Sequence, residues 1–233
     1  KFFESLNFWV DELDKVEFNN KGEEKNRSII SVINKFVFVQ TLDDYEIIDF
    51  NWIMESWAHI EQRWKSKGPK EILKQFFREV NTWFYEYYDT ELFTTQIIDY
   101  VKDDKENFVK LFDAMKFILG VKYYENPLGA RKGIIQYNFK HINEDVFGKA
   151  YEEYLSRIRH DEAIYYTPHY VTEHIVETTV GHIFDQKIQD IKDSIEAKNF
   201  GTAEKFVEEL QSLKILDPAC GSGSFLVKSF KKI

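Results

Sequence analysis

The stretch Ile215-Leu216-Asp217-Pro218-Ala219-Cys220-Gly221-Ser222-Gly223-Ser224-Phe225 decides how this chain is read. The residues from Lys214 to Leu216 predict the end of a buried strand, and Phe225-Leu226-Val227 predict the start of an apolar helix face. Between them lies a tight turn of small residues, in which Gly221 and Gly223 can adopt backbone angles closed to other residues. A strand, a glycine turn and a helix N-terminus bring free N–H groups together. The stretch therefore predicts a nucleotide-binding corner.

Two widespread nucleotide-binding patterns do not fit this corner. A phosphate-binding P-loop ends in Gly-Lys-Ser/Thr, and no Lys follows the glycines here. A dinucleotide fingerprint has a third glycine three positions after the second, where this chain has Leu226. On these residues alone, an ordinary strand-to-helix turn remains the alternative.

The full run from Asp217 to Phe225 resembles the S-adenosylmethionine-binding motif of N6-adenine and related amino-group DNA methyltransferases. The resemblance implies a class I, Rossmann-like α/β domain, of which this chain holds the N-terminal portion. It also implies S-adenosyl-L-methionine as the cofactor, held in part by Asp217, Pro218, Ala219, Cys220, Gly221, Ser222, Gly223 and Phe225.

A second resemblance lies at Ile164-Tyr165-Tyr166-Thr167-Pro168-His169-Tyr170-Val171. From the residues themselves, Thr167 is expected to cap a helix and Pro168 to occupy its first position. The segment is similar to the Tyr-Thr-Pro segment that precedes the cofactor motif in gamma-order adenine methyltransferases. That resemblance implies that Tyr166, Thr167 and Pro168 close over the methionine end of the cofactor. The alternative is a well-capped helix start with no ligand.

The rest of the chain predicts a mainly α fold, because apolar residues recur at steps of three and four. Ser28 is expected to cap one helix, Gly68-Pro69 to separate two others, and Gly120 and Gly201 each to end one. Residues 134–139 are expected to be a short strand or an extended segment. The aromatic-rich helical stripes are expected to form the core, including Trp57, Trp64, Phe76, Phe77, Trp83, Phe112 and Met115.

Two domains are expected, a helical connector domain over residues 1–160 and the N-terminal part of a methyltransferase domain over residues 161–233. Residues 137–152 resemble a segment found before the methyltransferase domain in type IIG restriction-modification enzymes and their phage-defence relatives, and the helices between Ile29 and Phe93 resemble the helical connector of those enzymes. A plain helical bundle is the alternative explanation of their spacing. The family's catalytic motif, Asn/Asp-Pro-Pro-Tyr/Phe, is absent, since no Pro-Pro occurs in the chain. We therefore assign no catalytic residue. We expect this segment, truncated after its cofactor motif, to be inactive alone.

Composition limits the remaining possibilities. The chain has 233 residues, a formal net charge of −9 and one cysteine, so it forms no internal disulfide and fits a reducing cytoplasm. No apolar run reaches the length of a membrane span. The negative net charge argues against the segment as a whole forming a surface that binds nucleic acid, because such surfaces are usually basic. His169, His174 and His182 lack metalloprotease spacing, so no metal is expected, and Cys220 reads as a structural residue.

The resemblances together imply a protein that transfers a methyl group to adenine N6 in double-stranded DNA, within a restriction-modification or phage-defence system. One alternative is a methyltransferase of the same fold with another substrate. A second is a non-catalytic helical interaction module whose glycine corner is only structural. A Pro-Pro-Tyr or Pro-Pro-Phe sequence in the full-length gene would separate these alternatives.

Overall fold

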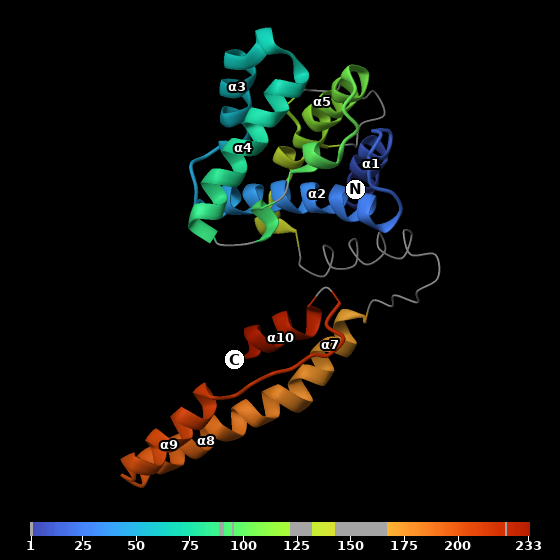
Figure 1. The fold of residues 1–233 in the computed structure, drawn as a ribbon. Helices are drawn as coiled ribbons and strands as arrows, with labels where there is room; N and C mark the ends of the chain where they lie inside the picture. The colour runs from blue at the N-terminus through green and yellow to red at the C-terminus, as the bar shows by residue number, and fades with distance from the viewer. Residues whose placement is uncertain (1, 89–90, 95, 122–131, 143–166, 222) are drawn as a thin grey trace. The chain divides into compact units, whose positions relative to one another are not determined.

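The computed structural model describes residues 2–88, 91–94, 96–121, 132–142, 167–221 and 223–233 (Figure 1). The chain divides into two compact units, Lys1–Asn143 and Glu144–Ile233. The domain boundary expected at residue 160 lies outside the described residues.

Helices make up the first unit, which confirms the mainly α prediction for the residues described. Its one β-type pairing among them is an isolated antiparallel bridge between Phe18 and Val101. None of the described helices is long and apolar enough to cross a membrane. The elements are α1 (Phe2–Asp14), α2 (Glu23–Asp44), α3 (Trp52–Trp64), η1 (Lys65–Lys67), α4 (Pro69–Tyr88), η2 (Glu91–Phe93), η3 (Ile97–Tyr100), α5 (Lys105–Leu119), η4 (Ile134–Gln136) and η5 (Phe139–His141).

An aromatic core joins α2, α3, α4 and α5. Phe36 of α2 stacks on Phe76 of α4 with ring centroids 5.6 Å apart, and Trp57 of α3 meets the same Phe76 ring edge-on at 4.9 Å. Such offset and edge-to-face pairs stabilise a core beyond the area they bury. Of the aromatic residues expected in the core, Trp57, Phe76 and Phe77 are buried, whereas Trp64, Trp83 and Phe112 are only partly buried.

A lysine lies inside this aromatic core. Lys35 of α2 is 1% exposed, and its Nζ donates a hydrogen bond of 2.6 Å to Oδ1 of Asn81 on α4. Its ammonium also lies within 6 Å of the ring centroids of Phe77 and Phe93. Burial lowers the pKa of Lys35 to about 8, against the opposing pull of the Asp99 carboxylate. The first unit therefore keeps a cation where hydrophobic packing alone would place an apolar side chain.

Several local predictions for the first unit are confirmed and two are wrong. Gly68 ends η1 with φ 85°, Pro69 opens α4, and Gly120 caps α5 with φ 88°. Ser28 does not cap a helix, because α2 already begins at Glu23 and the Ser28 hydroxyl donates to the Glu24 carbonyl. Residues 134–139 form no strand, since no strand lies beside them among the described residues: Ile134–Gln136 is a 3-10 turn, and only Tyr137 and Asn138 are extended before the next turn begins at Phe139.

From residue 167 onward, the described part of the second unit contains one long helical run, a helix that pairs with it as a hairpin, and a short last helix. Gly201 was expected to end a helix but lies inside one, because the preceding helix already ends near Lys198, whose φ is 58°. The elements are α7 (His169–Val176), the π-helical turn η6 (Glu177–Gly181), α8 (His182–Glu196), α9 (Phe200–Gln211) and α10 (Ser224–Lys232). Figure 1 shows α8 and α9 as a helical hairpin and α10 beside α7.

Candidate functional site

The chain reaches the glycine corner through an extended segment at residues 213–217, which follows α9. The strand predicted at Lys214–Leu216 is not formed, and the described residues contain no strand. A strand is defined by hydrogen bonds to a neighbour, and this segment has no strand neighbour among them. Leu216 is consequently 86% exposed, although its apolar side chain suits a buried strand.

The corner itself has the backbone geometry that the glycines predict. Gly221 has φ 52° and Gly223 has φ 81°, both in the left-handed region that favours glycine. The Gly223 N–H donates to the Cys220 carbonyl at 2.7 Å, which closes a tight turn, and α10 begins at the next residue. A Cβ built on Gly223 would meet no atom within 4 Å. The chain itself therefore leaves open space beside Gly223.

Asp217 anchors the start of the corner. Its Oδ1 accepts a hydrogen bond of 3.1 Å from the Ala219 N–H, the Asx-turn contact typical of Asp before a turn. Its Oδ2 is buried and has no hydrogen-bond partner among the described residues. A buried carboxylate oxygen without a partner is costly, so this atom calls for a donor that the described chain does not supply.

The helix start near Thr167 differs in detail from its prediction. Pro168 is the N-cap of α7, with φ −55° and ψ 142°, and His169 is the first helical residue. Thr167 therefore lies outside the helix, and no side chain caps it. The reason is that proline's fixed φ also suits the extended cap position, so it does not have to enter the first turn. Tyr166 and Ser222 lie outside the described residues.

Two cross-helix contacts place the first turns of α7 and α10 at the same end of the unit. Lys228 Nζ lies against His169 Nε2, and one turn farther along α10 Lys232 Nζ forms an ion pair of 2.9 Å with Oε2 of Glu177, about two turns after His169. Since both partners advance together along the chain, α7 and α10 run in parallel (Figure 1). Their N-terminal N–H groups, and the positive ends of their dipoles, therefore lie on one side.

A hollow of about 290 Å³ separates the extended segment from the two helices. Asp217, Pro218 and Phe225 line it, so three of the predicted site residues share one concave surface. The other lining residues come from the long helical run, the extended segment and α10, namely Ile175, Val176, Thr179, Val180, Ile215, Leu216, Leu226 and Ser229.

The π-helical turn and the pairs that join α10 to α7 were not predicted from the sequence. The π turn brings the buried Gly181 against α10, where a Cβ would lie 2.9 Å from Cε of Lys232. Lys232 also reaches Asp185, at 3.5 Å. A signal was present in the four-residue spacing of Lys228 and Lys232, which places two cations on one face of α10.

Residues 142–233 match the sequence profile of the N-6 DNA Methylase family. The C-terminal part of the chain is related to the N-6 DNA methylases. A curated relative, a putative type II restriction enzyme and methyltransferase of Methanocaldococcus jannaschii, is 28% identical over 115 residues, covering 40% of this chain. This chain spans about a tenth of that protein's length (10%). No solved structure matches the chain. The predicted similarity to restriction-modification methyltransferases is thus confirmed.

The residues of the matched segment fit the cofactor that the N-6 DNA Methylase family implies. S-adenosylmethionine carries a cationic amine, a carboxylate and a flat adenosine. The partnerless Asp217 Oδ2 suits the amine, and the open space beside Gly223 leaves room for ligand atoms at the backbone. The positive end of the α10 dipole suits a carboxylate. Cys220 is exposed, and no group of described residues is arranged to hold a metal ion.

Proposed function

We propose that this chain supplies part of the cofactor site of a DNA methyltransferase that methylates adenine N6 within a restriction-modification system. The family match over residues 142–233 and the restriction-methyltransferase relative support the class of enzyme. The observation that carries the proposal is the corner at residues 217–223, with its left-handed glycines and its partnerless carboxylate oxygen.

In this proposal the chain's own residues bind and orient the cofactor. Asp217 holds the methionyl amine, while the glycine backbone from Gly221 to Gly223 lets the ligand lie against the main chain. Phe225 forms an apolar wall of the hollow described above. Tyr166, Thr167 and Pro168 close the site from the start of α7. When bound, the cofactor supplies an electrophilic methyl group to a nitrogen nucleophile.

The proposal also involves two parts of a methyltransferase domain, an α/β sheet that the described residues do not form and a catalytic motif that this chain does not contain. Leu216 and the extended segment before the corner are exposed, as expected for a segment that takes its place in an α/β sheet. A motif of the type Asn/Asp-Pro-Pro-Tyr/Phe would accept hydrogen bonds from the adenine amino group and stack an aromatic ring on a base turned out of the duplex. We assign no catalytic residue within this chain.

Calorimetric titration of the full-length protein with S-adenosylmethionine tests the site. We expect binding by the wild type and its loss in Gly223→Val, because the new side chain fills the space reserved for ligand. Gly22→Val is the matched control: Gly22 also has a positive φ (58°) and no atom within 4 Å of its Cβ position, but it lies in the first unit. Equal loss in both variants would assign the effect to backbone strain.

A wild-type protein that binds no cofactor would favour the alternative of a helical interaction module. Binding of the cofactor without methylation of DNA would favour a methyltransferase with another substrate. These outcomes keep the three readings of the sequence apart.

A further inference from the structure

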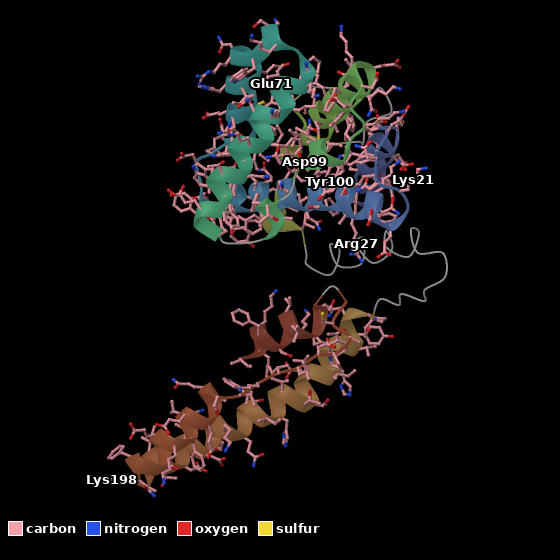
Figure 2. The ribbon with its side chains drawn as sticks, viewed as in Figure 1. Lys21, Arg27, Glu71, Asp99, Tyr100 and Lys198 are labelled. Atoms are coloured by element: carbon pink, nitrogen blue, oxygen red, sulfur yellow. The ribbon has the colours of Figure 1, made fainter. Side chains whose placement is uncertain are left out.

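The end of the α3–α4 pair is strongly basic, in contrast to the chain as a whole. Between residues 61 and 78 there are six basic and two acidic side chains, while the whole chain carries −9. Figure 1 shows α3 and α4 side by side, and Figure 2 labels Glu71 in the first turn of α4, at this end. The exposed cations that define what we call the α3–α4 basic patch are Arg63, Lys65, Lys67, Lys74 and Arg78.

These five basic residues have no carboxylate partner among the described residues, unlike most of the other surface lysines of the first unit. Elsewhere a surface lysine usually lies beside a carboxylate, as Lys70 does with Asp103 at 2.6 Å and Lys102 with Glu17 at 2.9 Å. No patch member forms an ion pair with any residue that the structure describes. The two acidic residues between residues 61 and 78 already have partners, since Glu61 pairs with Lys116 and Glu71 accepts a hydrogen bond from Gln75. Mutual repulsion of unpaired cations is unfavourable unless an anion offsets it.

The patch also has a concave part. Arg63 of α3 and Arg78 of α4 both line a hollow of about 430 Å³ between the two helices, with the partly buried Trp64 and Trp83. Two guanidinium groups that line one hollow from two helices can bind a phosphate through several N–H donors. Lys74 lies four residues before Arg78, about 6 Å along α4, and extends the positive surface as a stripe.

Glu79, the residue after Arg78, and Glu86, about two turns farther along α4, line the same hollow, so the hollow carries charges of both signs. A small anion held inside it would lie near these carboxylates. A long polyanion can instead also contact Lys65, Lys67 and Lys74, which do not line the hollow. The charge pattern therefore fits an extended ligand better than a small one.

We propose that the α3–α4 basic patch binds the phosphate backbone of double-stranded DNA. The choice of DNA over an acidic protein rests on the proposed function, since a DNA methyltransferase needs such contacts. The contact is independent of sequence, because it uses charge and no base edge. It gives the helical unit a role in holding the duplex, separate from the cofactor corner.

The test measures binding of a short fluorescein-labelled duplex of arbitrary sequence to the full chain by fluorescence anisotropy, without cofactor. The triple variant Arg63→Gln, Lys74→Gln, Arg78→Gln removes three charges from the patch. The control Lys192→Gln, Lys198→Gln, Lys205→Gln removes three from the α8–α9 hairpin, where Figure 2 labels Lys198 at the tip and acidic residues outnumber basic ones. All six side chains are exposed, and circular dichroism checks that both variants fold.

We expect the patch variant to bind at least tenfold more weakly at moderate salt, with the slope of log affinity against log salt reduced by about 2.7. The control should bind like the wild type. Equal weakening in the two triples, or no binding by the wild type at low salt, would overturn the proposal. Tighter binding of a polyglutamate peptide than of the duplex, lost in the patch variant, would assign the patch to an acidic protein instead. Because no cofactor is present, these outcomes do not depend on the cofactor site.

Discussion

Replacement of Lys35 by methionine should stabilise the first unit near neutral pH. The Lys35 ammonium is 1% exposed, and burial lowers its pKa from the ordinary 10.5 to about 8. That difference corresponds to about 3 kcal/mol of unfavourable free energy for the charged form in the folded protein. Methionine has a similar length and no charge, but it loses a hydrogen bond between a charged donor and the buried Asn81, worth about 1.5–3 kcal/mol. The expected net gain is therefore at most about 1.5 kcal/mol.

The pH dependence follows from the direction of the shift. Between pH 8 and 10.5 the unfolded chain binds more protons at Lys35 than the folded protein does, so the wild type gains stability as pH rises through this window. Below about pH 8 both states are protonated and the penalty is fully present. The advantage of Lys35→Met over the wild type should therefore be largest at pH 7 and shrink toward pH 10.

Urea unfolding followed by tryptophan fluorescence measures this difference. All five tryptophans lie between residues 9 and 83, so the signal reports on the first unit. Lys205→Met, at an exposed position of α9, is the control and should leave the midpoint unchanged. A Lys35→Met protein that is less stable at pH 7, or a stability difference that does not change with pH, would refute the reasoning.

Three further substitutions test the structure, two in the first unit and one, Gly201→Ala, in α9 of the second unit. Gly133→Ala should destabilise the protein by about 1–3 kcal/mol in thermal unfolding, because its Cβ would lie 2.2 Å from Cα of Gly120. Gly201→Ala, at a helix position where the new Cβ meets no atom, should stabilise the protein by about 0.5–1 kcal/mol. If Gly201→Ala destabilised the protein more than Gly133→Ala, this reasoning would be contradicted. Trp57→Ala should cost about 3–5 kcal/mol, since Trp57 is 2% exposed and packs on Phe76, and a cost near zero in urea unfolding would contradict the core assignment.

Local chemistry explains the parts of the fold that the sequence predicted. Apolar residues at three- and four-residue steps identified the helices, and Gly120 and Gly223 took the left-handed conformations that their positions demanded. Errors arose where two local signals competed. Ser28 is a good cap, but the acidic residues before it extend α2 to Glu23.

Long-range structure explains what the sequence could not predict. The strand expected at Lys214–Leu216 requires a neighbouring strand, and its own residues cannot supply one. The parallel arrangement of α7 and α10 depends on His169 and Lys228, which are 59 residues apart. Asp217 was predicted as a site residue by resemblance, but only the structure shows that one of its oxygens has no hydrogen-bond partner among the described residues. Its role in binding the cofactor stays a prediction.

The central claim is that the corner at residues 217–225 serves adenine methylation. The most direct test incubates the full-length protein with unmethylated duplex DNA and S-adenosylmethionine, then digests the DNA and identifies its nucleosides by mass spectrometry. The account predicts N6-methyladenine with the wild type and with Gly22→Val, and none with Gly223→Val. Methylation of cytosine alone, or N6-methyladenine at wild-type levels from Gly223→Val, would contradict it.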